Sequence, residues 1–145
     1  MTAPEIAALL AASRKLQLAT INRDGTPHLV AMYYVMIEER IAFWTYRSSQ
    51  KALNLARDPR LSCLVETGEQ YFDLRGVQVQ GVARRVDDPA AVIDIGRRIA
   101  AGLGDAPAGP LDDYLARAAR KRAGYIVQPE RIISWDHRKL LGPPA

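Results

Sequence analysis

The sequence predicts one mainly β domain in which an antiparallel sheet curls into a closed or partly closed barrel, with helices inserted between its strands. Three observations support this fold class. About six apolar segments of strand length follow one another, and several are joined by short turns. The 145 residues contain no repeat, linker or break in composition, so we expect residues 1–145 to form a single domain. Closing the sheet would hide its two edges, which otherwise invite pairing with other chains.

Helix and strand signals alternate along the chain. Thr2–Glu5 has the spacing of a capping box, which predicts a helix that ends near residues 14–15. Asp24-Gly25 is a hairpin signal, and the first three strands are expected to form an antiparallel meander. We expect Gly76 and Gly81 to kink a long strand. After the first helix, the expected elements are strands at 16–22, 28–37 and 41–46, a helix at 48–58, strands at 60–68 and 74–86, a helix from 89 to about 103, a loop at 104–110, a helix at 111–123, and one or two closing strands at 124–129 and 131–140.

Several classes of protein are excluded by what the sequence lacks. No apolar run approaches the roughly 18 residues of a membrane-spanning helix. A secretion signal has a cationic segment before its apolar one, and no such segment precedes the first apolar run here. Cys63 is the single cysteine, so neither an internal disulfide nor a cysteine-rich zinc site is expected. We therefore expect a cytoplasmic protein with no membrane span and no metal site. His28 and His137 lie far apart and belong to no hydrolase motif, which leaves the catalytic residues unknown.

The net charge indicates an anionic partner without choosing one. Lysine and arginine number 20 against 16 aspartate and glutamate, giving a formal charge of +4. Nucleic acid, a phosphate-bearing cofactor and a plain solvated surface are all compatible with this excess. Phe43, Trp44 and Tyr46 alternate within one expected strand, so at most one set faces outward, which argues against a stacking groove for single-stranded nucleic acid.

The segment from Thr45 to Lys51 has the parts of a phosphate site. It runs from the end of a strand into the start of a helix, where unpaired N–H groups and the helix dipole favour an anion. Ser48 and Ser49 add hydroxyl donors, while Arg47 and Lys51 add positive charge. The alternative interpretation is a capped surface helix with solvated cations, and the residues alone do not separate the two.

The order of these pieces resembles the pyridoxamine 5'-phosphate oxidase-like flavin-binding split barrels. The resemblance covers roughly residues 16–88 and rests on the hairpin turn, FWT at 43–45, SSQK at 48–51, NLARDPR at 54–60 and LRGVQVQGVARRV at 74–86. In that family a threonine and a Ser-x-Lys element at a helix start bind the cofactor phosphate. The resemblance therefore implies an antiparallel split β-barrel of the flavin-binding type, with Thr45, Ser49 and Lys51 at the phosphate.

Some positions differ from the oxidase itself. Gln50 stands where the oxidase has an arginine, Leu29 and Tyr34 fall near the places of its strand cations, and Gly76 replaces a glutamine. With these differences, and with the strings KALNLARDPR and RIISWDHRKL, the chain is similar to the flavin/deazaflavin oxidoreductases of subgroup B. Many of those use the deazaflavin coenzyme F-420. The resemblance thus implies coenzyme F-420 as the cofactor, with flavin mononucleotide (FMN) as the alternative.

The family resemblance also implies a homodimer that holds the cofactor in a groove at the subunit interface, next to a small-molecule substrate. The strand after the hairpin turn would back the ring system, because a planar redox ring needs an apolar wall and backbone groups at its edge. The implied cofactor-binding residues are Val30, Ala31, Met32, Thr45, Arg47, Ser48, Ser49, Gln50, Lys51 and Asn54.

The expected function is that of an oxidoreductase that passes a hydride from reduced coenzyme F-420 to an unsaturated organic substrate. Two alternatives stay open: an FMN-binding flavoprotein of the same fold, and a non-catalytic cofactor-binding carrier. The basic run at 117–123 is expected either to be a solvated helix face or to meet the oligoglutamate tail of coenzyme F-420. A nucleic-acid partner is not expected.

Overall fold

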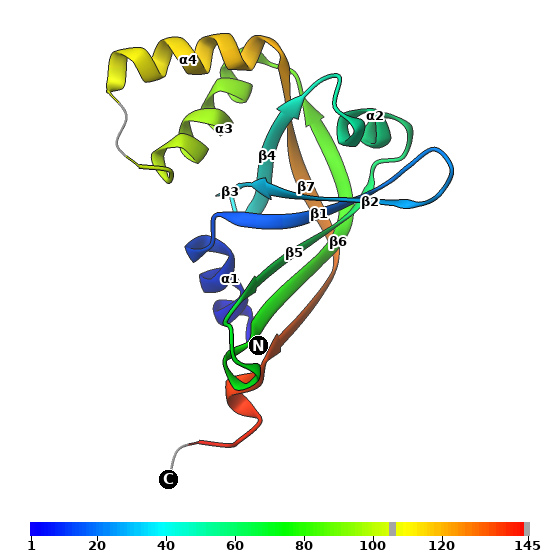
Figure 1. Ribbon diagram of the computed structural model, residues 1–145, viewed down its shortest axis with the longest axis vertical. Coiled ribbons are helices and arrows are strands. Elements are labelled where there is room, and N and C mark those ends of the chain that lie inside the picture. The colour runs from blue at the N-terminus through cyan, green and yellow to red at the C-terminus, as the bar shows by residue number, and fades with distance from the viewer. Residues whose placement is uncertain (105–106, 144–145) are drawn as a thin grey trace.

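A computed structural model describes residues 1–104 and 107–143, which form a curled antiparallel sheet of seven strands with four α-helices around it (Figure 1). This confirms the predicted mainly β fold with peripheral helices. Short 3-10 turns at Tyr71–Asp73 and His137–Lys139 were not expected from the sequence. The elements, in chain order, are α1 (Ala3–Ala12), β1 (Lys15–Ile21), β2 (Pro27–Tyr33), β3 (Val35–Ile37), β4 (Arg40–Tyr46), α2 (Gln50–Arg57), β5 (Arg60–Thr67), β6 (Arg75–Val86), α3 (Pro89–Ala101), α4 (Ala108–Arg120) and β7 (Arg122–Asp136).

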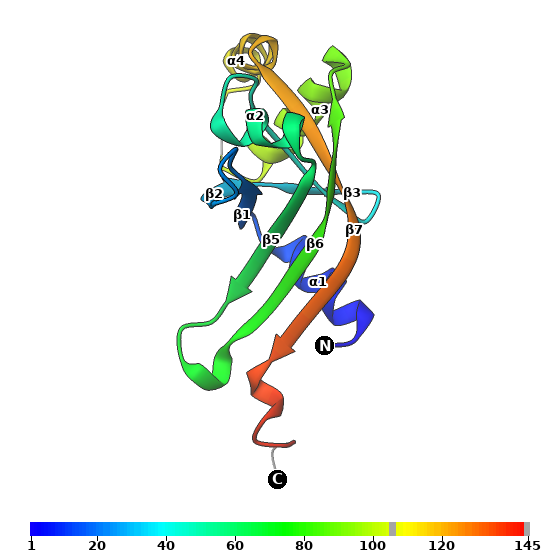
Figure 2. The same cartoon turned by 90° about the vertical axis from the view of Figure 1, so that its right-hand side faces the viewer.

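The order of strands shows how the sheet curls. It is β2-β1-β5-β6-β7-β4-β3, and Figure 2 shows the long strands β5, β6 and β7 running side by side. β2 and β3 lie at opposite edges of the sheet, yet a single residue, Tyr34, separates them. The two edges therefore approach each other at Tyr34. Because no ladder joins β2 to β3, the result is a half-barrel rather than a closed one.

The predicted meander of three strands is wrong. β1 and β2 form the expected hairpin around Asp24-Gly25, but β3 and β4 form a second hairpin at the far edge of the sheet. The expected strand at 28–37 is correspondingly broken at Tyr34, whose side chain is buried. The Tyr34 hydroxyl donates to the Leu10 carbonyl at 2.6 Å, and its backbone N–H donates to the Arg14 carbonyl at 3.0 Å. These bonds bind the crossing to the end of α1 instead of to a neighbouring strand.

The expected ends of the last helix are also corrected. α4 begins at Ala108, inside the expected loop at 104–110, of which residues 105–106 lie outside the described residues. Pro110 in the first helical turn is no obstacle, since the first N–H groups of a helix lack partners anyway. The helix ends at Arg120 because the chain from Arg122 pairs with β4 as the start of β7.

Two apolar clusters hold the helices on the sheet. The barrel interior is filled by alternate strand residues, including Leu16, Leu18, Val77 and Val79, which are almost completely buried. A smaller cluster joins α3 to the outer face of β4 through Ala42, Ile95 and Ile99, with Trp44 packed against it. This second cluster matters for function, because it sets one wall of the cleft described below.

The glycines of β6 play two different roles. The register of β6 against β7 shifts between Gln80 and Gly81, which confirms an irregularity at the second predicted kink. At Gly76 the pairing is regular, so the kink predicted there is wrong. The Trp135 ring instead covers Gly76 and occupies the space that a Cβ would need. Within the described residues, no helix is long and apolar enough to cross a membrane.

Candidate functional site

The predicted phosphate segment lies where β4 passes into α2. Ser49 is the N-cap of α2, and its hydroxyl accepts a hydrogen bond from the Ala52 backbone N–H at 3.2 Å. The same oxygen lies 3.2 Å from the Thr45 hydroxyl at the end of β4. Thr45 is buried, so this contact fixes the start of the helix relative to the strand. The polar edge of the segment is therefore held rigidly before any ligand arrives.

Lys51 stands out among the cations of this segment. Its side chain is half-buried in the first turn of α2, and no described carboxylate lies within 4.0 Å of its ammonium. Burial lowers the pKa of Lys51 below its usual range. A positive charge that is desolvated and lacks a counter-ion favours binding of an anion, which would supply the missing charge.

The remaining residues of the segment point elsewhere. The Arg47 guanidinium donates to the Arg122 carbonyl at 3.1 Å and lies 3.7 Å from an Asp87 carboxylate oxygen. Ser48 and Gln50 are exposed, and the Gln50 amide donates to Asn54 Oδ1 at 2.8 Å. Arg47 is thus partly neutralised, in contrast to Lys51.

The side chain of Asn54 lies on the buried side of α2 and has no exposed surface. Its amide nitrogen donates to Thr20 Oγ1 at 3.1 Å and to Asn22 Oδ1 at 3.0 Å, and both partners belong to the β1 hairpin. The structure therefore places Asn54 between α2 and β1, where its polar atoms are used within the protein. It does not line the cleft formed by the other predicted residues.

A cleft of about 360 Å³ brings together residues of β2, β4, α2, α3, α4 and β7. Four of the predicted residues line it: Ala31, Met32, Thr45 and Lys51. Val30 is not part of its lining and packs against the barrel core. The volume lies at the small end of the range for ligand pockets, which suits part of a cofactor or a cofactor shared with a second chain.

The sequence analysis missed the wall opposite β2. Trp44 and Tyr46, alternate residues of β4, line the cleft together with Tyr114 of α4 and Arg122 of β7. The Arg122 guanidinium carbon lies 4.8 Å from the Trp44 ring centroid and 4.1 Å from that of Tyr46. The alternation on β4 was visible in the sequence, but the pairing of β4 with β7 was not. A neighbouring hollow of about 380 Å³ continues past Arg122 along the basic end of α4.

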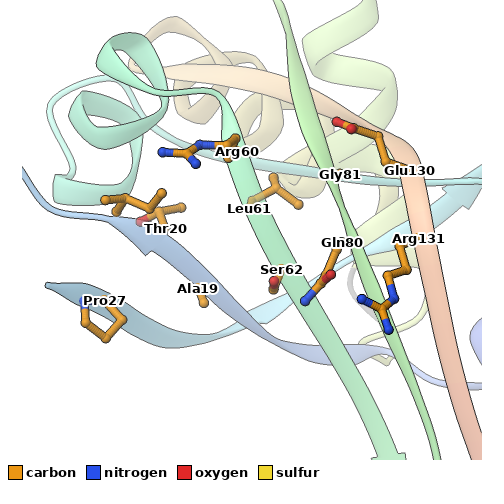
Figure 3. A pocket seen from close by; sticks show the side chains of 11 residues that line it. Ala19, Thr20, Pro27, Arg60, Leu61, Ser62, Gln80, Gly81, Glu130 and Arg131 are labelled. Atoms are coloured by element: carbon orange, nitrogen blue, oxygen red, sulfur yellow. The ribbon is translucent and has the colours of Figure 1, made fainter. Parts of the chain in front are cut away.

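A wider hollow of about 460 Å³ lies elsewhere, over β1, β5, β6 and β7 (Figure 3). None of the predicted site residues lines it. Its arginine Arg60 is held by Asp58 through contacts as short as 2.7 Å, and Glu130 stands beside Arg131 on its rim. For an anionic ligand we favour the smaller cleft, because no acidic residue is among its described lining while Lys51 and Arg122 are.

Other chemically notable residues lie away from the cleft. His28 Nδ1 is buried without a hydrogen-bond partner among the described residues, and His28 does not line the cleft. Cys63 is buried in the barrel, and this burial raises the pKa of its thiol to about 12, which makes it unreactive. The described residues contain no group of three histidine, cysteine or acidic side chains that could hold a metal ion.

Comparison with known proteins gives a family and several structural relatives. The family model described as "Pyridoxamine 5'-phosphate oxidase" matches residues 2–136. A conserved hypothetical protein from Mycobacterium tuberculosis is 41% identical over 100% of this chain and 91% of its own, with a TM-score of 0.90. An F-420 reductase is 25% identical over 87% of this chain and 94% of its own, with a TM-score of 0.65.

A more distant structural relative is HutZ, the heme storage protein from Vibrio cholerae. It is 22% identical over 90% of this chain and 92% of its own, with a TM-score of 0.69. At this identity the likeness concerns the fold alone. A comparison with the curated proteins found no match in sequence.

Proposed function

This chain belongs to the pyridoxamine 5'-phosphate oxidase family, and from that premise we propose that it is an oxidoreductase that binds the deazaflavin coenzyme F-420. In this proposal a hydride passes from the reduced coenzyme to an unsaturated organic substrate in the same cleft. The observation that supports it best is Lys51, a half-buried cation without a carboxylate partner among the described residues, at the start of a helix that opens into an apolar cleft.

The residues present fit a ligand that carries a phosphate and a flat ring. The start of α2 offers unpaired N–H groups and the positive end of the helix dipole, next to the ammonium of Lys51. Beyond this polar end, Ala31, Met32, Trp44 and Ile99 give the cleft an apolar lining that suits a planar ring. Phosphate at one end and ring along the wall is the arrangement we propose.

The chain itself contributes binding and orientation. When bound, the reduced deazaflavin supplies the hydride, so no side chain has to act as a nucleophile. Thr45, Ser49 and Lys51 fix one end of the coenzyme, and the apolar walls exclude water from the ring and hold the substrate close to it. Tyr33, Tyr46 and Tyr114 line the cleft, and we propose that one of their hydroxyls carries a proton to the substrate.

The choice of coenzyme F-420 over FMN rests on the distribution of charge. Neither Leu29 of β2 nor Tyr34, which follows that strand, provides a cation, whereas Arg117, Arg120 and Lys121 extend the positive surface beyond the cleft. A long ligand with acidic groups spread along its tail uses such a surface better than a compact flavin phosphate does. The similarity to an F-420 reductase points the same way.

Two further parts of the proposal concern assembly and location. One copy leaves the cleft open, and we infer that a second copy of the chain completes it in a symmetric homodimer. We also propose that the protein works in the cytoplasm, where its single thiol would stay reduced.

The test is a pair of equilibrium titrations of the purified protein with coenzyme F-420 and with FMN, followed by stopped-flow mixing of the reduced complex with an enone. We expect tighter binding of coenzyme F-420 and faster oxidation by the enone than by air. Tight binding without any enone-dependent oxidation would support the carrier alternative. If the purified protein contains a tightly bound flavin that coenzyme F-420 cannot displace, the proposal is wrong and the FMN-flavoprotein alternative takes its place.

A further inference from the structure

Arg122 occupies the junction between the two hollows that meet at α4. It lines the cleft of about 360 Å³ and also the neighbouring hollow of about 380 Å³. Its side chain is half-buried, as the first residue of β7, immediately after the basic end of α4. A ligand that fills the cleft and extends outward along α4 therefore has to pass Arg122.

The orientation of Arg122 is fixed without a carboxylate. Its guanidinium packs on the rings of Trp44 and Tyr46, at 4.8 Å and 4.1 Å, and one Nη donates to the Ala118 carbonyl at 3.2 Å. Other arginines of this protein are held differently. Arg60 and Arg138 each form paired hydrogen bonds to an aspartate, which neutralises them.

The contacts that orient Arg122 thus leave its positive charge free to bind an anionic ligand. No carboxylate of the described residues lies within 4.0 Å of it, and the described lining of both hollows contains no acidic side chain. The basic residues before it have a structural explanation, because Arg117 and Arg120 lie in the last turn of α4, where cations stabilise the helix end. Arg122 lies outside the helix and donates only one N–H to that last turn, at the Ala118 carbonyl, and its guanidinium forms no other hydrogen bond to the described residues.

The surroundings of Arg122 also limit what it can bind. The rings of Trp44 and Tyr46 lie against the guanidinium, and the remaining lining of the cleft is largely apolar, including Met32, Ile99 and Leu103. A planar, conjugated body can lie against this apolar lining while a carboxylate attached to it reaches the remaining N–H donors of the guanidinium. A neutral ligand of the same shape would leave the charge without a partner.

From these contacts we infer that the Arg122 end of the cleft binds the carboxylate of an unsaturated or aromatic acid. The inference deepens the proposed function, on which it rests, by naming a chemical class for the second ligand of the same cleft. Arg122 is then a specificity-determining residue that selects acidic over neutral acceptors, at a point separate from the phosphate-binding start of α2.

The test compares cinnamate with cinnamamide, which share a conjugated body and differ in charge. Binding is followed through the indole N–H signals of the two tryptophans in the nitrogen–proton NMR spectrum, assigned with the Trp135→Phe variant. Trp44 lies beside Arg122 and is the reporter, while Trp135 lies over Gly76 and is the internal control. We expect only the Trp44 signal to shift, with cinnamate bound at least about tenfold more tightly than cinnamamide.

Matched variants identify the residue responsible. Arg122→Ala should abolish the preference for cinnamate, and Arg122→Lys should retain part of it, since the charge remains but the planar fork is lost. Arg23→Ala, which removes one positive charge from an exposed turn, should leave the preference unchanged. Equal affinities in the unmodified protein, a preference that survives Arg122→Ala, or shifts at Trp135 alone would overturn the inference. If Arg122→Ala fails to fold, Arg122→Lys takes its place, and a preference for cinnamate that is unchanged by loss of the planar fork would overturn the inference.

A second arm finds the source of the carboxylate. If cinnamate still binds, with the same preference, after coenzyme F-420 has been added, the carboxylate belongs to a second ligand. If instead Arg122→Ala weakens binding of intact coenzyme F-420 but not of the coenzyme stripped of its glutamyl tail, the anion site serves that tail. The first result supports the inference, whereas the second would overturn it, because a glutamyl tail is neither unsaturated nor aromatic. A preference for cinnamate in a protein that binds no coenzyme F-420 would leave this site standing and remove the proposed function.

Discussion

Lys51 and Asn54 lie one turn apart on α2, yet their side chains meet opposite surroundings. Lys51 reaches the cleft with no described counter-ion, whereas Asn54 is fully buried and bonded to Thr20 and Asn22. A side chain that awaits a ligand should affect binding, and one that completes internal hydrogen bonds should affect folding. Substituting each in turn separates the two roles.

The first prediction concerns Lys51→Ala. If Lys51 contacts the coenzyme phosphate, its loss removes a charge-assisted hydrogen bond, which is worth about 1.5–3 kcal/mol or roughly tenfold to a hundredfold in affinity. The free energy of unfolding should hardly change, because the ammonium has no described protein partner. Fluorescence titration with coenzyme F-420 and urea unfolding measure the two quantities.

Asn54→Ala is the matched comparison for Lys51→Ala. It leaves the Thr20 hydroxyl and the Asn22 amide oxygen without a donor under the helix, which should lower the free energy of unfolding by about 1–3 kcal/mol. Unchanged coenzyme affinity in Lys51→Ala would remove the phosphate site at α2, whatever Asn54→Ala does to stability.

The second prediction concerns acid stability and Asp136. Hydrogen bonds from Arg138 hold the pKa of the Asp136 carboxyl at about 2, below its ordinary value of 3.8. Because the folded-state pKa is depressed, this stabilisation is present above about pH 4 and is lost as the pH falls toward 2. Asp136→Asn should therefore be less stable at pH 7 and lose less stability between pH 4 and pH 2.

The pH effect at Asp136 is checked by urea unfolding midpoints at several pH values. Asp113→Asn on the exposed face of α4 is the control, since the Asp113 carboxylate forms no ion pair with the described residues. Parallel pH curves for the wild type and Asp136→Asn would show that the Arg138 contact contributes nothing to the folded state.

At the scale of single residues, the sequence predicted which site residues group together when they are close along the chain, and missed site residues that are distant in sequence. Thr45, Ser49 and Lys51 fall within one strand-to-helix junction, so their grouping followed from local geometry alone. Arg122 joins the same cleft only because β7 pairs with β4, and no local pattern announces that pairing. Asn54 was assigned to the cofactor with its neighbours, but the geometry of α2 turns its side chain toward β1.

Among the helices, α3 has one especially close contact with the sheet. Gly96 faces the Trp44 ring, and a Cβ built on Gly96 would overlap that ring. Trp44 in turn lines the cleft and lies against the Arg122 guanidinium. A side chain at position 96 would therefore have to push α3 away from β4 or move Trp44 into the cleft.

The third prediction is that Gly96→Ala destabilises the protein, although alanine normally favours a helix over glycine. Overpacking of this kind costs about 1–3 kcal/mol, which exceeds the roughly 1 kcal/mol gained in helix propensity. Gly109→Ala in α4 is the control, since a Cβ there meets nothing within 4 Å and the substitution should be neutral or stabilising. Thermal unfolding of both variants, with the Trp44 indole signal as a local reporter, measures the difference. Equal stability in the two variants would contradict close packing at Gly96.

The elements themselves were predicted well where the signal was local. The capping box of α1 forms as expected, with Glu5 N–H donating to Thr2 Oγ1 at 3.3 Å. The errors arise from long-range pairing: Tyr34 breaks a continuous apolar run because the chain must cross from one edge of the sheet to the other. The start of β7 likewise ended α4 earlier than its helix-forming residues suggest.

For the whole molecule, the notable feature is exposed apolar surface on the edge strand β2, beside the open side of the cleft. The outward residues of β2 are exposed although two of them are large and apolar: Leu29 is 68% exposed and Tyr33 is 43% exposed. β2 is an edge strand of the sheet, and Tyr33 lines the cleft. Apolar side chains at an open edge beside a ligand cleft fit a contact with a second copy, which would also cover the coenzyme.

The last prediction is that the protein forms a dimer without the coenzyme and that coenzyme binding requires this dimer. Light scattering at micromolar concentration should give twice the protomer mass of 16.0 kDa. Leu29→Glu places a charge on the proposed contact, so it should shift the population toward monomer. It should also weaken coenzyme F-420 binding, because the second copy no longer closes the cleft. Lys51→Ala should weaken binding and leave the mass unchanged, which separates the two causes. A 16.0 kDa species that binds coenzyme F-420 at full affinity would show that one copy is sufficient for the site.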